Sequence, residues 1–165
     1  MKKLTTIFLS AILLLTLAAC GGNNAGNGGG DQAAPDLNQY YEDFMASLGE
    51  DNQPAMMDVE ADLISQVYPG LESVPTKQAV LKTAMISAVA CEFALVEVEN
   101  ASDAQTVADI FQARIDYQIE AGAFYPMTQE GWQKAEIITK GNVVALICAG
   151  EQQDQAAEAF NKLFA

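Results

Sequence analysis

The first 19 residues differ so sharply from the rest of the chain that they separate a targeting segment from the part that folds. Lys2 and Lys3 precede an uncharged run over residues 4–19 that ends in small residues. A basic start, an apolar middle and a small-residue end are the parts of a secretory signal peptide. The run is also shorter than the ~20 apolar residues of a membrane-spanning helix. The sequence therefore predicts that residues 1–19 are a cleaved signal peptide.

The end of this segment, Leu17-Ala18-Ala19-Cys20, resembles the lipobox of bacterial lipoproteins. In that motif the cysteine thiol receives a diacylglycerol, and a dedicated peptidase cuts just before the cysteine. The resemblance implies cleavage between Ala19 and Cys20 and lipidation of Cys20. Because each buried CH₂ contributes roughly 0.8 kcal/mol, two or three acyl chains hold a protein durably at a membrane surface. The expected location is extracytoplasmic, with a lipid anchor in the cell membrane. An ordinary signal peptide that contains a cysteine is the alternative.

The composition changes again after Cys20. Residues 21–35 hold 6 of the chain's 12 glycines and several asparagines, which predicts a flexible linker with a reach on the order of 20 Å. The cysteine and this linker together make up residues 20–35. The remaining residues, 36–165, are long enough for a single domain with one substantial core.

Charge and histidine content exclude several classes of function. Removal of residues 1–19, which contain two lysines and no acids, leaves 6 basic and 22 acidic residues, a net charge of −16. A nucleic acid needs a basic surface stripe, so nucleic acid is not an expected partner. Histidine is absent, which excludes Ser-His and Cys-His catalysis and His-ligated zinc. We expect no cofactor and no enzymatic activity, because no other catalytic arrangement is recognisable.

The first and last parts of the domain have helical periodicity. Asp36 is placed to cap a helix whose apolar residues recur every three or four positions, and Gly49 ends it. A second helix is predicted over residues 54–67, because Pro54 suits a first turn. The chain closes with an amphipathic helix whose apolar face contains Ala156, Phe160, Leu163 and Phe164.

The middle of the domain alternates between strands and helix. Residues 90–98 predict a strand, and residues 79–85 a second strand or a helical turn. Ser102 with Gln105 predicts a capping box for a long helix, which Gly122 ends in the left-handed conformation. A short helix or turn follows over residues 126–134. Strands over 135–140 and 143–149 flank the hairpin dipeptide Gly141-Asn142.

The resulting order is α-α-β-α-β-β-α. This order favours an α+β fold, with a small, mostly antiparallel sheet and helices packed on one side of it.

Several motifs in the second half of the chain occur together in a known family. They are Ala113-Arg114-Ile115-Asp116, Gly122-Ala123-Phe124-Tyr125-Pro126 followed by Glu130 and Trp132, Gly141-Asn142-Val143-Val144, and the closing helix over 160–164. From about residue 62 to 165, the chain resembles the bacterial surface lipoproteins grouped as domain of unknown function 4358. The family more often has Trp at Phe124 and Tyr at Val143, and we interpret both differences as exchanges in the core. The resemblance implies location and fold but no activity.

Cys91 and Cys148 are the only thiols besides Cys20, and each lies in a predicted strand. An exported compartment permits a disulfide between them, which would add a few kcal/mol, roughly as expected for a loop of this size. We favour two buried free cysteines that act as small apolar residues. A redox role is the least favoured alternative, because no Cys-x-x-Cys spacing lowers a thiol pKa.

Arg114 is the only arginine after the signal peptide. Its planar guanidinium suits a carboxylate or phosphate ligand. An internal ion pair with Glu92, Glu97 or Glu136 is the favoured alternative.

Asp58, Glu60 and Asp62 alternate like the first ligands of a calcium loop. The glycine and the final glutamate of that loop are missing, however, so we expect a solvated helical face and no metal site.

The segment from Gly122 to Trp132 is rich in aromatic residues at a helix exit. A binding loop containing Phe124, Tyr125 and Trp132 is one interpretation, because recognition residues concentrate on loops. The favoured alternative is structural, with Phe124 and Trp132 packed against the sheet.

These observations favour a lipid-anchored, non-catalytic domain that binds an envelope protein or another ligand. Two alternatives remain. A solute-binding lipoprotein associated with a transporter is one, although about 130 residues make only one lobe. A hydrolase that uses carboxylates alone is the other.

Overall fold

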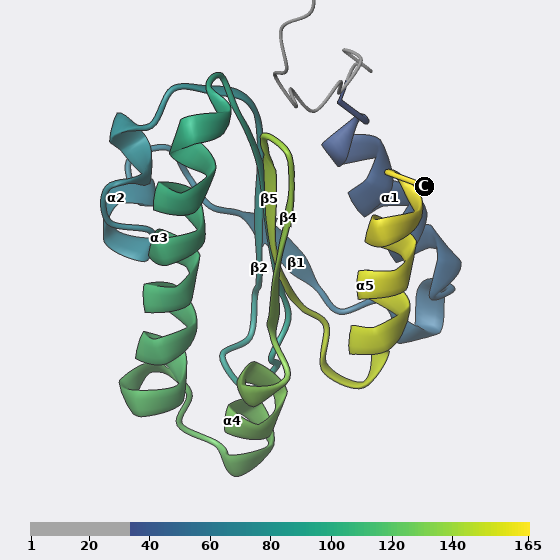
Figure 1. Ribbon diagram of the computed structural model, residues 1–165. Coiled ribbons are helices and arrows are strands. Elements are labelled where there is room, and N and C mark those ends of the chain that lie inside the picture. The colour runs from purple at the N-terminus through teal and green to yellow at the C-terminus, as the bar shows by residue number, and fades with distance from the viewer. Residues whose placement is uncertain (1–33) are drawn as a thin grey trace, which may run out of the picture. The chain divides into compact units, whose positions relative to one another are not determined.

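The computed structural model describes residues 34–165 (Figure 1). The predicted signal peptide, the lipidation site Cys20 and most of the linker lie outside the described residues. The described chain forms a five-stranded sheet in the order β1-β2-β3-β5-β4, and every neighbouring pair is antiparallel. The strands are β1 (Met56–Asp58), β2 (Thr76–Ala84), β3 (Glu92–Val98), β4 (Glu136–Lys140) and β5 (Val143–Cys148). The predicted α+β class with an antiparallel sheet is confirmed.

Five α-helices connect and cover these strands in the described residues. They are α1 (Leu37–Ser47), α2 (Ile64–Val67), α3 (Ala104–Tyr117), α4 (Pro126–Gln133) and α5 (Gln153–Lys162). Short 3₁₀ turns occupy Glu50–Asn52, Leu71–Ser73, Ala101–Asp103 and Gly150–Gln152, and a π-helical turn occupies Gln118–Gly122. None of the helices in residues 34–165 is long and apolar enough to cross a membrane.

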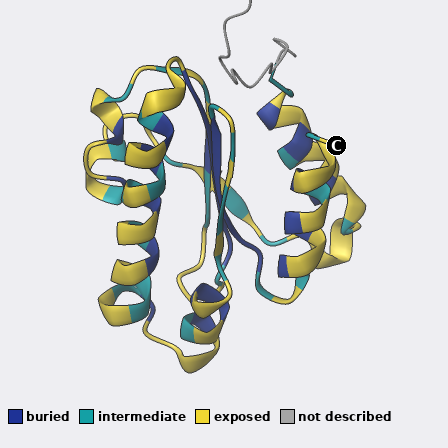
Figure 2. Ribbon diagram, viewed as in Figure 1, coloured by how far each residue is buried: buried dark blue, intermediate teal, exposed yellow. Residues whose placement is uncertain are grey.

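The helices cover both faces of the sheet, so the prediction of helices on one side is wrong. Figure 1 shows α2 and α3 on one side of the sheet, α1 and α5 on the other, and α4 at the lower end of the strands. Each side has its own apolar cluster, one around Phe111 of α3 and the other around Phe93 of β3 and Phe160 of α5. As a result every residue of β3 and β5 is buried, as the dark strands in Figure 2 show. Strands with both faces covered lack the alternation of apolar and polar residues that a sheet with one solvated face requires.

Glu97 is a buried acid in a strand whose sequence resembles that of a strand with one solvated face. It alternates with valines in β3, yet only 6% of its surface is exposed. Its carboxylate accepts hydrogen bonds from Gln78 Nε2 at 2.8 Å and Asn142 Nδ2 at 3.0 Å, and Lys77 Nζ lies at 3.4 Å. Burial alone would raise the pKa of Glu97, but these donors outweigh burial and lower the pKa below its ordinary value. A buried carboxylate satisfied in this way looks, in the sequence, like an exposed one.

Local signals place several elements where they were predicted. The Asp36 carboxylate accepts a hydrogen bond from Gln39 N at 3.0 Å and caps α1. The β4–β5 hairpin turns at Gly141, whose φ of 62° favours glycine. α1 and α5 lie side by side, as Figure 1 shows, and Tyr40 Oη of α1 donates to the Ala156 carbonyl of α5 at 2.8 Å. Phe160 of α5 is buried as expected, but Leu163, which follows the helix, is exposed.

The predicted helix over 54–67 is wrong. Its first part is β1, whose Met56 pairs with Ala84 of β2, and only the four residues of α2 are helical. β2 would otherwise leave a row of unpaired backbone groups, and pairing them outweighs local helix propensity.

The ends of α3 also differ from the prediction. The Ser102–Gln105 capping box does not form, and Asp103 stands at the N-cap without a side-chain cap. Gly122 does not have a positive φ; the helix widens into the π-helical turn, where Ala123 N donates to Gln118 O at 2.8 Å.

Candidate functional site

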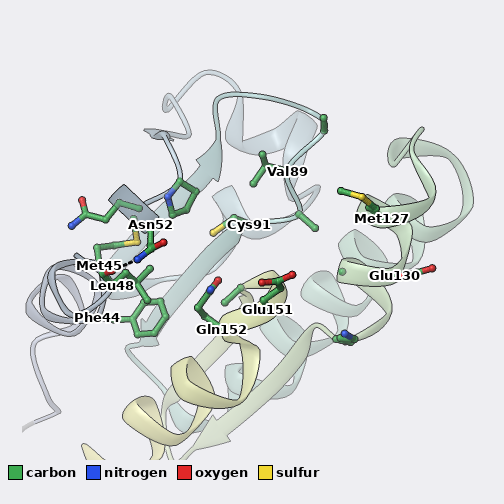
Figure 3. Close-up of a pocket in the computed structure, with 18 of the residues that line it drawn as sticks. Phe44, Met45, Leu48, Asn52, Val89, Cys91, Met127, Glu130, Glu151 and Gln152 are labelled. Carbon is green, nitrogen blue, oxygen red and sulfur yellow. Dashed lines mark hydrogen bonds between the residues drawn. The ribbon is translucent and has the colours of Figure 1, made fainter. Parts of the chain in front are cut away.

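A cavity of about 480 Å³ opens at the end of the sheet where β3 begins and β5 ends (Figure 3). Four parts of the chain form its walls. They are the end of α1 with the turn after it, the β2–β3 loop, α4, and the β5–α5 loop. Its lining includes Phe44, Met45, Leu48, Asp51, Asn52, Gln53, Pro54, Val89, Cys91, Met127, Glu130, Lys134, Glu151 and Gln152. This volume falls in the range of about 300–1,000 Å³ that is typical of small-ligand sites.

Two close contacts hold α4 against the β2–β3 loop. Thr128 Oγ1 donates to the Ala88 carbonyl at 3.0 Å. Gly131 faces Ala90 so closely that a Cβ on the glycine would lie 2.4 Å from the Ala90 Cβ. Because both contacts come from the buried side of α4, they set the position of the helix at the cavity edge.

Exposed apolar side chains gather on the same two segments. The β2–β3 loop exposes Met85, Ile86 and Val89, and the start of α4 and the turn before it expose Phe124, Tyr125 and Met127. Phe124 and Met127 are 85% and 78% exposed. We call these six residues the apolar lip. Exposed apolar residues that gather in this way mark interaction surfaces more often than isolated ones do.

The predicted binding loop is therefore split. Phe124 and Tyr125 belong to the apolar lip, and their rings pack edge to face with centroids 5.4 Å apart. Trp132 is only 3% exposed and lies in the core on the α3 side. The interpretation of Phe124 as a core residue packed on the sheet is wrong, because 85% of its surface is exposed, whereas Ala123 before it is buried.

Arg114 forms a buried ion pair with Glu92, one of the three acids considered for it. Arg114 Nε and Nη2 donate to the two Glu92 oxygens at 3.0 and 2.7 Å. Tyr68 Oη and Thr83 Oγ1 donate to the same carboxylate at 2.8 and 3.2 Å. Burial lowers the pKa of Arg114, but the hydrogen bonds and charge of Glu92 outweigh it and raise the pKa overall. The guanidinium is thus committed to Glu92, which leaves the anion-site alternative without support.

The two cysteines are free and buried, and the disulfide alternative is wrong. Cys148 pairs with Glu92 across β3 and β5, so Cys91 stands one position away and points to the opposite face of the sheet. Cys148 accordingly belongs to the apolar cluster on the α3 side and Cys91 to the one on the α1 side. Burial raises the pKa of Cys91 to about 12 and that of Cys148 further. Both thiols are protonated at neutral pH and are poor nucleophiles.

The calcium-like acids do not come together. Asp58 lies in β1, where its carboxylate is 2.6 Å from Lys82 Nζ, and Glu60 and Asp62 are exposed in the turn that follows. Within residues 34–165, no three His, Cys, Asp or Glu side chains are grouped to hold a metal ion. The third acid considered for Arg114, Glu136, is exposed at the start of β4.

Sequence reasoning missed most of the cavity wall. Residues 85–89 are apolar except for Ser87 and follow a strand, a pattern that buried residues share. Asp51 and Glu151 lie in 3₁₀ turns and give no motif. The glycine at 150, with a φ of 56°, was the available signal for a sharp turn there.

The fold places the chain in the class of small α+β domains whose antiparallel sheet is covered by helices. Within that class, the model of the family described as "Domain of unknown function (DUF4358)" matches residues 49–149. The chain belongs to this family, as the motifs between residues 113 and 144 suggested. The resemblance was expected over about residues 62–165, so the match begins earlier and does not include the closing helix over 160–164. The match includes the β2–β3 loop and α4, whereas α1 and α5 lie outside it. Searches of curated proteins and of solved structures found no match.

Proposed function

We propose that this protein is a lipid-anchored, non-catalytic binding module at the cell envelope, and that it binds its ligand at the cavity and the apolar lip. The anchor rests on the lipobox at Leu17–Cys20. The binding role rests on one observation, an open cavity whose wall includes the exposed apolar residues Val89 and Met127. The other residues of the apolar lip lie on the same two segments, the β2–β3 loop and the start of α4 with the turn before it. Exposing these side chains costs hydrophobic free energy, about 25 cal/mol per Å² of apolar surface, which a partner recovers when it covers them.

The chemistry of the site favours binding over catalysis. The cavity wall contains no histidine, and its cysteine, Cys91, has a pKa of about 12. The most deeply buried carboxylate, Glu92, is paired with Arg114 and does not line the cavity. A general base needs a poised pKa and access to substrate, and Glu92 has no such access.

Anchoring is tested with Cys20→Ser, which offers no thiol for the thioether bond. Wild-type protein from a bacterial host should fractionate with membranes, and mass spectrometry should find a diacylglyceryl cysteine at its N-terminus. The Cys20→Ser chain should lose both properties. An unlipidated wild-type protein cut at another position would refute the anchor.

Binding is tested by crosslinking and capture from solubilised envelopes. Full-length protein is compared with a Phe124→Ser/Met127→Ser variant, whose two positions are exposed and should not affect folding. The matched control is Met57→Ser/Leu63→Ser, two apolar residues that are 43% and 37% exposed outside the lip. We expect capture to be lost in the first variant only. Equal capture by all three proteins would contradict a role of the lip. A small solute that raises the melting temperature in a dose-dependent way would instead favour the transporter-associated alternative.

A further inference from the structure

The cavity has apolar walls on two opposite sides. Phe44, Met45 and Leu48 come from the end of α1, and Val89 and Met127 come from the β2–β3 loop and α4. Figure 3 shows the first group facing the second across the space in front of Cys91. Phe44 and Met45 are buried, whereas Val89 and Met127 are 40% and 78% exposed. The space between them therefore suits an apolar side chain that enters from outside.

The charged groups of the wall carry an excess of negative charge. Asp51, Glu130 and Glu151 line the cavity together with a single cation, Lys134. None of the four is in an ion pair within residues 34–165. In Figure 3 Glu151 rises from the β5–α5 loop beside Gln152, and Glu130 lies at the outer edge of α4. Unpaired like charges beside an apolar space favour a ligand that brings a positive charge.

The remaining polar groups are amides. Asn52, Gln53 and Gln152 line the cavity, and each amide side chain offers both donors and acceptors, which match the groups of a peptide backbone. Asn52 uses one donor on the Leu48 carbonyl at 3.1 Å, which leaves its oxygen available. A peptide is thus a better match than a ligand with charge alone.

From these three features we infer that the cavity binds an extended peptide segment in which a basic side chain stands next to an apolar one. The inference rests on the proposed binding function and names its ligand class. The apolar side chain enters between α1 and α4, the basic one faces Asp51 and Glu151, and the amides hold the backbone. An acidic segment is excluded by the same charges and by the net charge of −14 over the full sequence.

The test measures fluorescence anisotropy of a labelled, amidated hexapeptide of alternating lysine and leucine, with the full-length protein in detergent at low salt. Two matched peptides replace lysine by glutamate or leucine by serine, and spermidine serves as a competitor with charge alone. We expect the lysine–leucine peptide to bind about tenfold or more tightly than either matched peptide, because both kinds of contact contribute. We expect spermidine to compete only weakly.

Two pairs of variants distinguish peptide binding at the cavity from non-specific attraction by the net negative charge of the protein. Asp51→Asn/Glu151→Gln should weaken binding about fivefold or more, a loss that two partly exposed ion pairs can account for. The matched control, Glu60→Gln/Asp62→Asn, removes the same charges outside the cavity wall and should change affinity less than about twofold.

Three outcomes would overturn the inference. They are equal losses in the two variant pairs, equal binding of the serine peptide, and no binding of the lysine–leucine peptide up to millimolar concentration. If envelope capture through Phe124 and Met127 persists in any of these cases, the proposed function stands and only the ligand class fails. If capture is also lost, both fail.

Discussion

The ion pair between Glu92 and Arg114 offers the most direct test of how this domain is held together. Glu92 has no exposed surface, and the Arg114 side chain is 12% exposed. Replacing Glu92 by Gln keeps the shape but removes the charge, so the guanidinium stays buried without a counter-ion. The amide nitrogen of Gln also cannot accept the hydrogen bond that one carboxylate oxygen accepts.

The size of the effect follows from this burial. Breaking a buried pair by removing one partner costs about 3–5 kcal/mol, because the other charge is left uncompensated. The stability of a whole domain is only about 5–15 kcal/mol. Glu92→Gln should therefore lower the free energy of unfolding by about 3 kcal/mol or more, and Arg114→Met, which strands a fully buried carboxylate, by at least as much.

The double variant Glu92→Gln/Arg114→Met distinguishes the pair from two separate contributions. It leaves no unpaired charge, so it should be more stable than the sum of the single losses predicts, with a coupling energy of about 1–3 kcal/mol. Tyr68 and Thr83 keep a partner in the glutamine side chain, which limits the remaining cost.

Urea unfolding of all four proteins provides the measurement. Trp132 is the only tryptophan, and its ring centroid lies 5.5 Å from the Arg114 guanidinium, so its fluorescence reports on the site itself. The exposed Glu158–Lys162 pair is the control, and Glu158→Gln should leave the urea midpoint unchanged. A loss below about 1 kcal/mol for Glu92→Gln would refute the argument, because it would mean that water reaches the guanidinium.

Three further predictions concern the core and the cavity wall. Trp132→Ala should cost about 3–5 kcal/mol in urea unfolding, because the ring is 3% exposed, whereas Phe124→Ala, at 85% exposed, should cost less than about 0.5 kcal/mol; equal effects would contradict this placement. Gly131→Ala should destabilise by about 1–3 kcal/mol despite the better helix propensity of alanine, because its Cβ would lie 2.4 Å from that of Ala90. Adding Ala90→Gly should recover most of that loss, and no recovery would rule out this contact as the cause. In a Cys20→Ser chain, Cys91, whose pKa is about 12, and the buried Cys148 should not react with a thiol reagent at pH 8 while the protein is folded, but both should react fully in guanidinium. Rapid reaction of the folded protein would show an accessible thiolate.

The elements that were predictable from sequence are those whose signal lies within a few residues. The Asp36 cap and the Gly141 turn each act through local backbone geometry, so the sequence around them is sufficient. β1 was not predictable, because three residues of strand exist only through pairing with β2, which lies some 25 positions further along the chain.

Glu97 and Cys91 show that the environment of a side chain is hard to predict from the sequence around it. The sequence indicates a polar residue and a thiol, but their environments depend on which helices cover the sheet. Glu97 is satisfied by Gln78 and Asn142 from two other parts of the chain. Cys148 pairs with Glu92, the residue after Cys91, so the two thiols point to opposite faces of the sheet. The free state of the cysteines was the favoured prediction, but the faces they point to depend on register, which is a tertiary property, as are the partners of the buried acid.

The division between the core and the cavity gives the strongest reason to place function at one end of the domain. In the described residues, the buried polar groups have internal partners, and no buried side-chain nitrogen or oxygen is left without a hydrogen bond. Glu92, Arg114 and Glu97 are therefore occupied in holding the fold. The cavity wall is different, because Asp51 and Glu151 are exposed and in no ion pair there, beside apolar side chains that the fold leaves uncovered. A packed core does not require these exposed groups, and this is why we propose that a partner binds at this end of the domain.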